Sequence, residues 1–304
     1  SEVEHCHEIV ELVQKTGLTY MMGETCWFYP SAMFCRGLLQ SGKLGKFVYA
    51  ESQYHHDISH FPANFLADMK SAGVPPFFYP THSTAMVLSA AGSYVKKVTA
   101  FGYRDSEPDH YYEKGINMWD NIFSNEFSLM ELANGGVARV NECRRIGYKA
   151  PSSYVSAFYG TEGAYQFHST QHLVTYKRPA PENIAMEDVS DMVNPMEMTK
   201  HRGEAGFMQR VANHAYQWDS FAPVQEEERR KLPVEFIGLP NGHMASHQFL
   251  IHDFCTAAYA GKTPLRNHAW DAARFTIPGL TAHVSALRGG EVMHVFDCGD
   301  PILK

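Results

Sequence analysis

The pattern of apolar and polar residues predicts helices and a strand in alternation at the start of the chain. Residues 3–15 have apolar side chains at helical spacing, and Gly17 follows them as a helix-ending residue. The apolar run 18–22 predicts a short buried strand, and Pro30 suits the first turn of a second helix that ends near residues 41–42. This order is typical of the end of an α/β unit, so we expect the unit to begin upstream of residue 1.

The period of the pattern changes from residue 45 onward. Residues 47–56 alternate between two faces, which predicts a strand, and 82–91 predict a helix. Further strands are predicted at 94–104, 121–131, 136–146, 151–160, 163–168 and 171–177. The expected fold class is therefore α/β (α+β), with an open, mixed, largely antiparallel sheet that carries helices on one face.

The segment 178–240 has a different character, because it is charged, rich in methionine and flanked by prolines. We interpret it as an irregular, cap-like insertion over a pocket, with one helix over 204–218. Helices at 246–260 and 267–287 follow, the second bent by Pro278, and a last strand is predicted near 291–297.

Composition excludes several classes of protein. The 304 residues include 26 basic and 33 acidic side chains, a formal charge of −7, so binding of nucleic acid through a basic face is not expected. Residues 71–95 lack charged side chains, but their prolines and polar residues indicate a buried loop and helix, and no membrane partner is expected.

The six cysteines are scattered, and none forms a C-x-x-C pair. This favours a reducing compartment over a disulfide framework or a zinc ribbon. No secretory signal is visible, so we expect a cytoplasmic protein, while a periplasmic or exported location stays open.

The end of the first two-faced strand carries Tyr54, His55, His56 and Asp57, and His60 lies close behind. Tyr54 and His56 point to one side of the strand. Three interpretations remain open: the binding of sugar hydroxyls, a divalent metal site, or hydrogen bonds to loop backbone.

A second candidate is Tyr79-Pro80-Thr81-His82, where a proline-rich loop enters a helix. The partial positive charge of a helix N-terminus disfavours imidazolium, so His82 would stay neutral and able to accept a proton. The alternative is an N-terminal capping network with Thr81 as the cap.

A third candidate is the loop 241–247, where Gly242 precedes His243 and Ser246 is the expected N-cap of a helix. His243 and His247 are therefore possible ligand contacts. Neither the G-x-G-x-x-G nor the G-x-x-x-x-G-K-[ST] motif occurs among the 23 glycines, so a complete dinucleotide-binding fold is not expected within this sequence. His5 and His7 lack the spacing of a metal motif, and no metal is expected.

Taken in order, the motifs resemble the glucose–fructose oxidoreductase/inositol dehydrogenase/rhizopine catabolism (Gfo/Idh/MocA) family. They are Met22-Gly23-Glu24-Thr25-Cys26, Gly45-Lys46, Tyr54-x-His56-Asp57, Tyr79-Pro80-Thr81-His82, Tyr159-Gly160-Thr161-Glu162-Gly163 and Gly242-His243. The resemblance covers the later part of a family member. It implies that residues 1–44 are the tail of an N-terminal nucleotide-binding domain and 45–304 a C-terminal substrate-binding and oligomerisation domain.

The resemblance implies an oxidoreductase that uses NAD or NADP, held mainly by a preceding domain, to oxidise a sugar, polyol or related carbohydrate. His82 and Tyr79 would be catalytic, with His82 as general base. Glu24 and Cys26 would lie near the nicotinamide, and Tyr54, His56, Asp57, His243 and His247 would bind substrate. A homodimer or homotetramer formed through the sheet is implied as well.

Two departures from the family pattern leave other functions open. The family's Glu-Lys-Pro motif is absent, and Phe78 stands four residues before His82, where the family usually has aspartate. The Y-P-T-H loop also resembles NAD-dependent glycosidases of the α-N-acetylgalactosaminidase type, which gives a second candidate function. A non-catalytic carbohydrate-binding or dimerisation module is the third.

Overall fold

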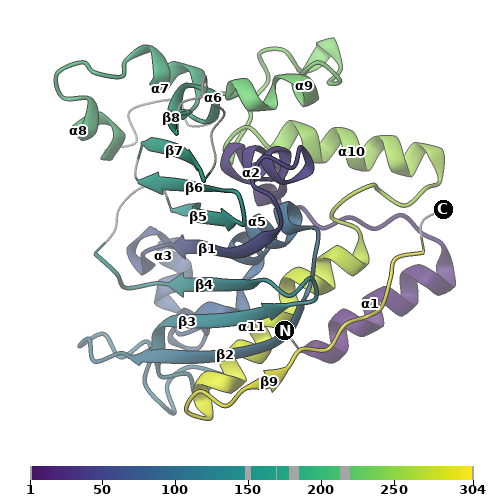
Figure 1. The fold of residues 1–304 in the computed structure, drawn as a ribbon. Helices are drawn as coiled ribbons and strands as arrows, with labels where there is room; N and C mark the ends of the chain where they lie inside the picture. The colour runs from purple at the N-terminus through teal and green to yellow at the C-terminus, as the bar shows by residue number, and fades with distance from the viewer. Residues whose placement is uncertain (1, 148–151, 169, 178–184, 213–219, 303–304) are drawn as a thin grey trace.

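The fold is built on one large mixed sheet, seen in the centre of Figure 1. A computed structural model describes residues 2–147, 152–168, 170–177, 185–212 and 220–302. In this part of the chain the strands follow the order β8-β7-β6-β5-β1-β4-β3-β2-β9. Their bounds are β1 Phe47–His55, β2 Val95–Arg104, β3 Phe123–Leu132, β4 Val137–Cys143, β5 Ser153–Gly160, β6 Gly163–His168, β7 Gln171–Tyr176, β8 Met186–Asp188 and β9 Met293–His294.

Strand β1 lies between β4, which it pairs in parallel, and β5, which it pairs antiparallel. The other described pairs are antiparallel. The expected fold class, an open, mixed and mostly antiparallel sheet, is therefore confirmed.

The longer helices lie on one face of this sheet (Figure 1). They are α1 Val3–Thr16, α2 Pro30–Gln40, α5 Thr81–Ala91, α10 His247–Ala260 and α11 Ala269–Leu287. Every α5 residue from His82 to Ala90 is buried. A helix surrounded by protein on all sides cannot carry charged side chains without partners, which explains the charge-free stretch 71–95.

Short helices connect these elements. Around the site they are η1 Thr25–Phe28, η2 Ile58–His60, α3 Ala63–Ala67, α4 Met69–Ala72 and η3 Pro76–Phe78. The described parts of the insertion contain α6 Ser190–Val193, α7 Met196–Lys200, α8 Phe207–Ala212, η4 Pro223–Gln225, α9 Glu226–Arg229 and η5 Val234–Phe236. Helices α6 to α9 gather at the β7 and β8 end of the sheet in Figure 1.

On the opposite face of the sheet, none of the described helices lies over the β4–β3–β2 part (Figure 1). Phe101, Phe127 and Leu129 form part of this open face and are exposed. The strand register places Phe127 beside Phe101, and Leu129 beside Arg139. Residues on the helix-covered face alternate with these and are buried, as expected for strands of period two.

Three expectations about elements are corrected. Residues 18–22 form no strand, because no strand of the described chain pairs with this segment. The predicted burial fails as well, since Leu18 is 70% exposed. Pro80, not Thr81, is the N-cap of α5, and it makes no side-chain capping bond. The helix predicted over 204–218 is described only as Phe207–Ala212, and residues 213–218 lie outside the described residues.

The remaining predicted helices and strands agree with the structure to within a few residues, whereas strand β8 and the short helices α3, α4, α6, α7 and α9 were not predicted. Gly17 ends α1 with a left-handed φ of 68°. Pro278 lies inside α11, and the last strand is shorter than predicted, β9 covering only two residues. Among the described residues, no helix combines the length and the apolar character that crossing a membrane requires.

Candidate functional site

The first part of the site is the segment that joins α1 to α2. Glu24 is the N-cap of η1, and its Oε1 accepts a hydrogen bond from the Cys26 backbone N–H at 2.8 Å. Asn267 holds the same segment from behind: its carbonyl accepts from the Met22 N–H at 2.7 Å, and its Nδ2 donates to the Glu24 carbonyl at 2.9 Å. Asn267 is fully buried with a left-handed φ of 55°, so the Glu24 backbone is fixed on two sides.

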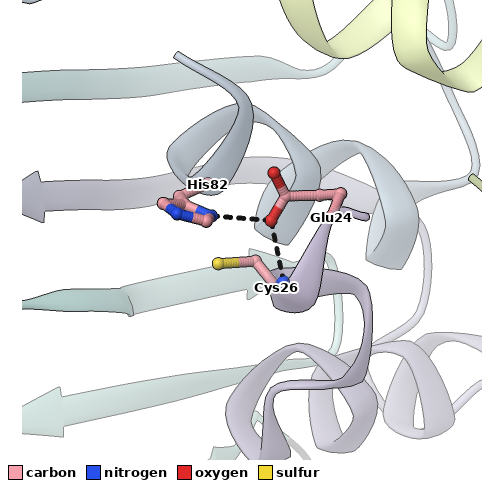
Figure 2. Close-up of side chains that lie close together, drawn as sticks. All are labelled: Glu24, Cys26 and His82. Carbon is pink, nitrogen blue, oxygen red and sulfur yellow. Dashed lines mark hydrogen bonds and ion pairs between the residues drawn. The ribbon is translucent and has the colours of Figure 1, made fainter. Parts of the chain in front are cut away.

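The second part of the site is the start of α5, which carries His82 to Glu24 (Figure 2). The His82 Nδ1 lies 2.7 Å from Glu24 Oε1, and the His82 Nε2 lies 3.1 Å from the Tyr79 hydroxyl. Glu24 is 2% exposed and His82 6%, whereas Tyr79 is 48% exposed. Glu24, His82 and Tyr79 therefore form a chain of hydrogen bonds from a buried carboxylate to the hydroxyl of a half-exposed tyrosine.

The charge of Glu24 determines the direction of these hydrogen bonds. Burial alone would raise the pKa of Glu24, but the nearby His82 and hydrogen bonds from His82, Thr81 and Cys26 outweigh it and lower that pKa. An ionised carboxylate only accepts, so the His82 Nδ1–H donates to Glu24. In the neutral imidazole, Nε2 is then an acceptor, and the Tyr79 O–H donates to it.

Cys26 lies against the same carboxylate. Burial, followed by the charge of Glu24, raises the pKa of the Cys26 thiol well above its ordinary value, so the thiol is neutral. Glu24, Cys26 and His82 each offer one possible metal-ligand atom, and these atoms lie within 4.8 Å of one another. We interpret the 2.7 Å contact between Glu24 and His82 as a hydrogen bond rather than as an empty metal site. Glu24 Oε1 already accepts two hydrogen bonds, one from the Cys26 N–H and one from His82 Nδ1.

Aromatic rings form one wall beside Tyr79 and His82. The Tyr54 ring lies 5.0 Å from the His82 ring and 5.8 Å from the Tyr79 ring, and His56 stacks on Tyr54 at 5.4 Å. Burial, followed by the charges of Arg144 and neighbouring histidines, lowers the pKa of His56 to about 4, so this ring is neutral at pH 7. The wall offers flat faces and few charges.

A further side of the site is formed by the turn before α10. The His243 ring lies 6.1 Å from the His82 ring, and His243 Nδ1 is 2.8 Å from His247 Nε2. A Cβ at Gly242 would come within 2.5 Å of the His247 ring, so this pair needs glycine there. Ser246 is the N-cap of α10 by position only, because its side chain makes no capping bond.

Charged residues buried beneath the site hold the loop that carries Tyr79. Glu126 Oε1 accepts from His283 Nδ1 at 2.7 Å, and its Oε2 accepts from the Phe77 N–H at 2.8 Å. The Arg144 guanidinium donates to the Pro76 carbonyl at 3.3 Å and lies 5.2 Å from the centre of the Tyr54 ring.

Glu142 is the register partner of both Tyr54 and Glu126. It accepts from the Ser83 hydroxyl and pairs with Arg144. Burial raises the pKa of Glu142 well above its ordinary value, and Arg144 opposes that shift. The start of α5 is therefore attached to β4, and the η3 loop before it to β3, by fully buried polar groups.

The structure brings together most of the residues that the sequence singled out. Around one site lie Glu24, Cys26, Tyr54, His56, Tyr79, His82, His243 and His247. Asp57 has another role: its carboxylate caps η2 by accepting from the backbone N–H and hydroxyl of Ser59 at 2.9 and 2.6 Å. Of the interpretations open for this segment, local backbone bonding is the one that Asp57 fulfils.

Sequence reasoning missed the supporting residues. Glu126, Glu142 and Arg144 stand at inward positions of predicted strands, where a charged side chain is expensive unless paired. A charged side chain at an apolar position of a predicted strand is therefore the sequence signal that indicates these buried, paired residues. Asn267 and Gln225 lie outside the predicted strands, where an uncharged polar residue conflicts with no pattern, so no comparable signal pointed to them.

Comparisons with known proteins give the fold a context. No family model and no curated protein matches the sequence. Among solved structures, levoglucosan dehydrogenase in complex with NADH and levoglucosan matches 96% of this chain and 70% of its own, at 16% identity and a TM-score of 0.64.

Two other solved structures are similar to the same extent. An NAD-binding oxidoreductase from Klebsiella pneumoniae matches 97% of this chain and 71% of its own, at 11% identity and a TM-score of 0.67. An oxidoreductase from Agrobacterium radiobacter in complex with NAD⁺, L-tartaric acid and magnesium matches 97% and 70%, at 13% identity and a TM-score of 0.61. The fold of the chain thus resembles the C-terminal part of such oxidoreductases.

Proposed function

We propose that this protein is an NAD(P)-dependent oxidoreductase that oxidises a hydroxyl group of a neutral sugar or polyol. The observation that carries the proposal is the hydrogen-bonded series Tyr79–His82–Glu24, because it connects the hydroxyl of a half-exposed tyrosine to a buried carboxylate through an imidazole. A carboxylate that holds one nitrogen of histidine, and thereby makes the other a base, is a recurrent arrangement for proton transfer.

In the proposed mechanism, Tyr79 is the first group that the substrate hydroxyl meets, since His82 and Glu24 are buried. Burial, followed by the charge of Glu24, raises the pKa of Tyr79, so its hydroxyl is neutral and donates to His82 Nε2. As the substrate O–H gives its proton to the Tyr79 oxygen, the Tyr79 proton moves to His82 Nε2. Glu24 then stabilises the imidazolium, which makes His82 the base of the reaction.

The resemblance implies a nicotinamide cofactor, and the open backbone at Gly23 fits its flat ring. A Cβ at Gly23 would meet no atom within 4 Å, so the surface next to Glu24 and Cys26 is accessible. When bound, NAD or NADP supplies the acceptor for the hydride that leaves the carbinol carbon. The substrate would thus lose one hydride to the cofactor and one proton, with His82 protonated at the end, and become a carbonyl product. A preceding domain would hold the dinucleotide phosphates.

The character of the site walls favours a neutral substrate. Tyr54 and His56 offer aromatic faces, on which the C–H face of a sugar ring can pack, and His56 is neutral. Arg144, which lies against the Tyr54 ring, is buried and bonded to Glu142 and Pro76. Levoglucosan and L-sorbose, bound in similar structures, are neutral carbohydrates, whereas L-tartaric acid is an acid.

We also propose the domain division and an assembly. Residues 1–44 would belong to the nucleotide-binding part and 45–304 to the substrate-binding part, with 178–240 as an insertion at the site. The open sheet face around Phe101, Phe127 and Leu129 would pack against a second copy, because large exposed apolar patches are typical of interfaces. The charged pairs Glu51–Arg139 and Lys97–Glu131 lie on the same face of the sheet.

The test is to incubate the full-length protein with NAD⁺ or NADP⁺ and a panel of neutral sugars, polyols and hydroxy acids. Stoichiometric formation of NADH or NADPH with a ketone product supports the proposal. Release of a sugar from a glycoside without net cofactor reduction would instead identify the glycosidase, and binding without turnover would identify a carbohydrate-binding module. Activity that survives exhaustive chelation would exclude a metal at Glu24, Cys26 and His82.

A further inference from the structure

The turn that carries His243 has an unusual backbone. His243, Met244 and Ala245 have φ values of 46°, 58° and 64°, three consecutive residues with side chains in the left-handed region. Histidine tolerates this conformation better than most residues, but methionine and alanine rarely adopt it even singly, because Cβ approaches the following carbonyl oxygen. Such a turn persists only where its surroundings hold it.

The consequence of the turn is the placement of His243. The left-handed path places the His243 ring 6.1 Å from the His82 ring and its Nδ1 2.8 Å from His247 Nε2. A relaxed backbone at residues 243–245 would redirect the His243 side chain. Whatever holds the turn therefore shapes this side of the site.

Gln225, in η4 of the insertion, is the residue that connects this turn to the insertion and to η1. Its Nε2 donates to the Met244 carbonyl at 2.8 Å and to the Phe28 carbonyl at 2.9 Å, and its Oε1 accepts from the Ala222 N–H at 2.8 Å. Gln225 is 0% exposed, so water cannot replace these bonds.

The three partners of Gln225 belong to three separate parts of the chain. Ala222 belongs to the insertion, Met244 to the left-handed turn, and Phe28 to η1, which follows Glu24. One amide side chain thus uses both of its donor hydrogens and its oxygen to connect the insertion to two segments of the site. Asn241 adds a further bond within the turn, from its Nδ2 to the Ala245 carbonyl at 3.1 Å.

We propose that Gln225 is a positioning residue for substrate specificity: it makes the insertion part of the substrate site by holding His243 opposite His82. The claim about the turn is independent of any activity, whereas the claim about specificity rests on the proposed function. Because His243 lies outside the Tyr79–His82–Glu24 series, its displacement should weaken substrate binding more than it slows proton transfer.

The test compares Gln225→Met with Gln248→Met in the full-length protein. Methionine keeps the length of the side chain and removes its hydrogen bonds. Gln248 is a matched control, since it is 7% exposed and its Nε2 also donates to two insertion carbonyls, those of Phe236 and Leu239, at 3.2 and 3.1 Å. The readouts are KM and kcat, together with the HN–Hα couplings of residues 243–245, which report φ.

Gln225→Met should raise KM about tenfold or more, with kcat within about threefold, and should change the couplings, while Gln248→Met changes neither. Unchanged couplings and KM in Gln225→Met would overturn the proposal, as would an equal change in both variants. If Gln225→Met does not fold, Gln225→Glu replaces it, because a carboxylate still accepts from Ala222 but cannot donate to Met244. If no substrate is turned over, the couplings alone decide about the turn, and the proposed function fails separately.

Discussion

Replacing Glu24 by glutamine tests the proton-transfer series at its buried end. Glu24 Oε1 accepts two hydrogen bonds, from Cys26 N–H and from His82 Nδ1–H. Glutamine has the same shape, but its oxygen is neutral and its NH₂ can donate to His82 Nδ1. In that case the proton of His82 moves to Nε2, which then no longer accepts from Tyr79.

The expected effect on the rate follows from this exchange of tautomers. General acid–base catalysis contributes about 10²–10⁴-fold, so Glu24→Gln should lower kcat by about that factor, with a smaller effect on KM. The assay is kcat at saturating substrate, combined with ¹⁵N NMR of the imidazole nitrogens of His82. In the wild type, Nδ1 should carry the proton at neutral pH.

The same substitution should also change stability. A hydrogen bond to a charged group contributes about 1.5–3 kcal/mol and a neutral one about 0.5–1.5, so two weakened bonds cost about 2–3 kcal/mol of unfolding free energy. The pKa of Glu24 in the folded protein lies below its ordinary value of 4.5. Its contribution is therefore present above that pH and is lost as pH falls through the lower, folded pKa.

Glu126→Gln is the matched control. Glu126 is fully buried and accepts from His283 at the same distance of 2.7 Å, but it lies outside the Tyr79–His82–Glu24 series. It should destabilise the protein without changing the tautomer of His82. The reasoning is refuted if Glu24→Gln keeps kcat within about threefold of wild type, or if His82 carries its proton on Nε2 in the wild type.

Three further predictions concern other parts of the molecule. Tyr79→Phe keeps the ring but removes the hydroxyl, so kcat measured at saturating substrate should fall about 10- to 100-fold. An unchanged kcat would show that the substrate reaches His82 directly. Arg144→Met removes the positive charge beside buried Glu142 and should lower the free energy of unfolding in urea by about 3–5 kcal/mol. Adding Glu142→Gln should restore part of that loss. If the losses of the two single variants simply add in the double variant, the pairing of Arg144 with Glu142 is contradicted. Burial lowers the pKa of His172 to about 4 from 6.5, so the unfolded chain binds a proton in this range that the folded protein does not. Unfolding free energy should therefore fall as pH decreases from 6.5 to 4, and His172→Gln should reduce that slope by about one proton.

Much of the fold could be predicted because it follows from local patterns. Alternation identified strands such as β1, and the charge-free stretch 71–95 identified the central buried helix α5. The run 18–22 was misread, since an apolar pattern of five residues does not reveal whether a neighbouring strand is there to pair with it. Pairing is a property of the whole sheet rather than of the segment.

The candidate site was predictable where chemistry-bearing residues stand close together in the sequence. Tyr54 with His56, and Tyr79 with His82, were found in this way, and the structure places them in contact. The direct bond from His82 to Glu24 joins residues 58 positions apart, and no local pattern contains it. Gln225 is a further case, because its role depends on three carbonyl and N–H groups that only the folded chain brings together.

The proposed mechanism depends on His82 as the base that receives, through Tyr79, the proton equivalent of a substrate hydroxyl whose carbon gives up hydride. The most direct measurement is the rate of NAD(P)H formation by His82→Gln on the best neutral substrate, with substrate affinity measured separately by calorimetry. We expect kcat to fall at least about 10²-fold while the dissociation constant changes by less than about fivefold. Full activity of His82→Gln would contradict it.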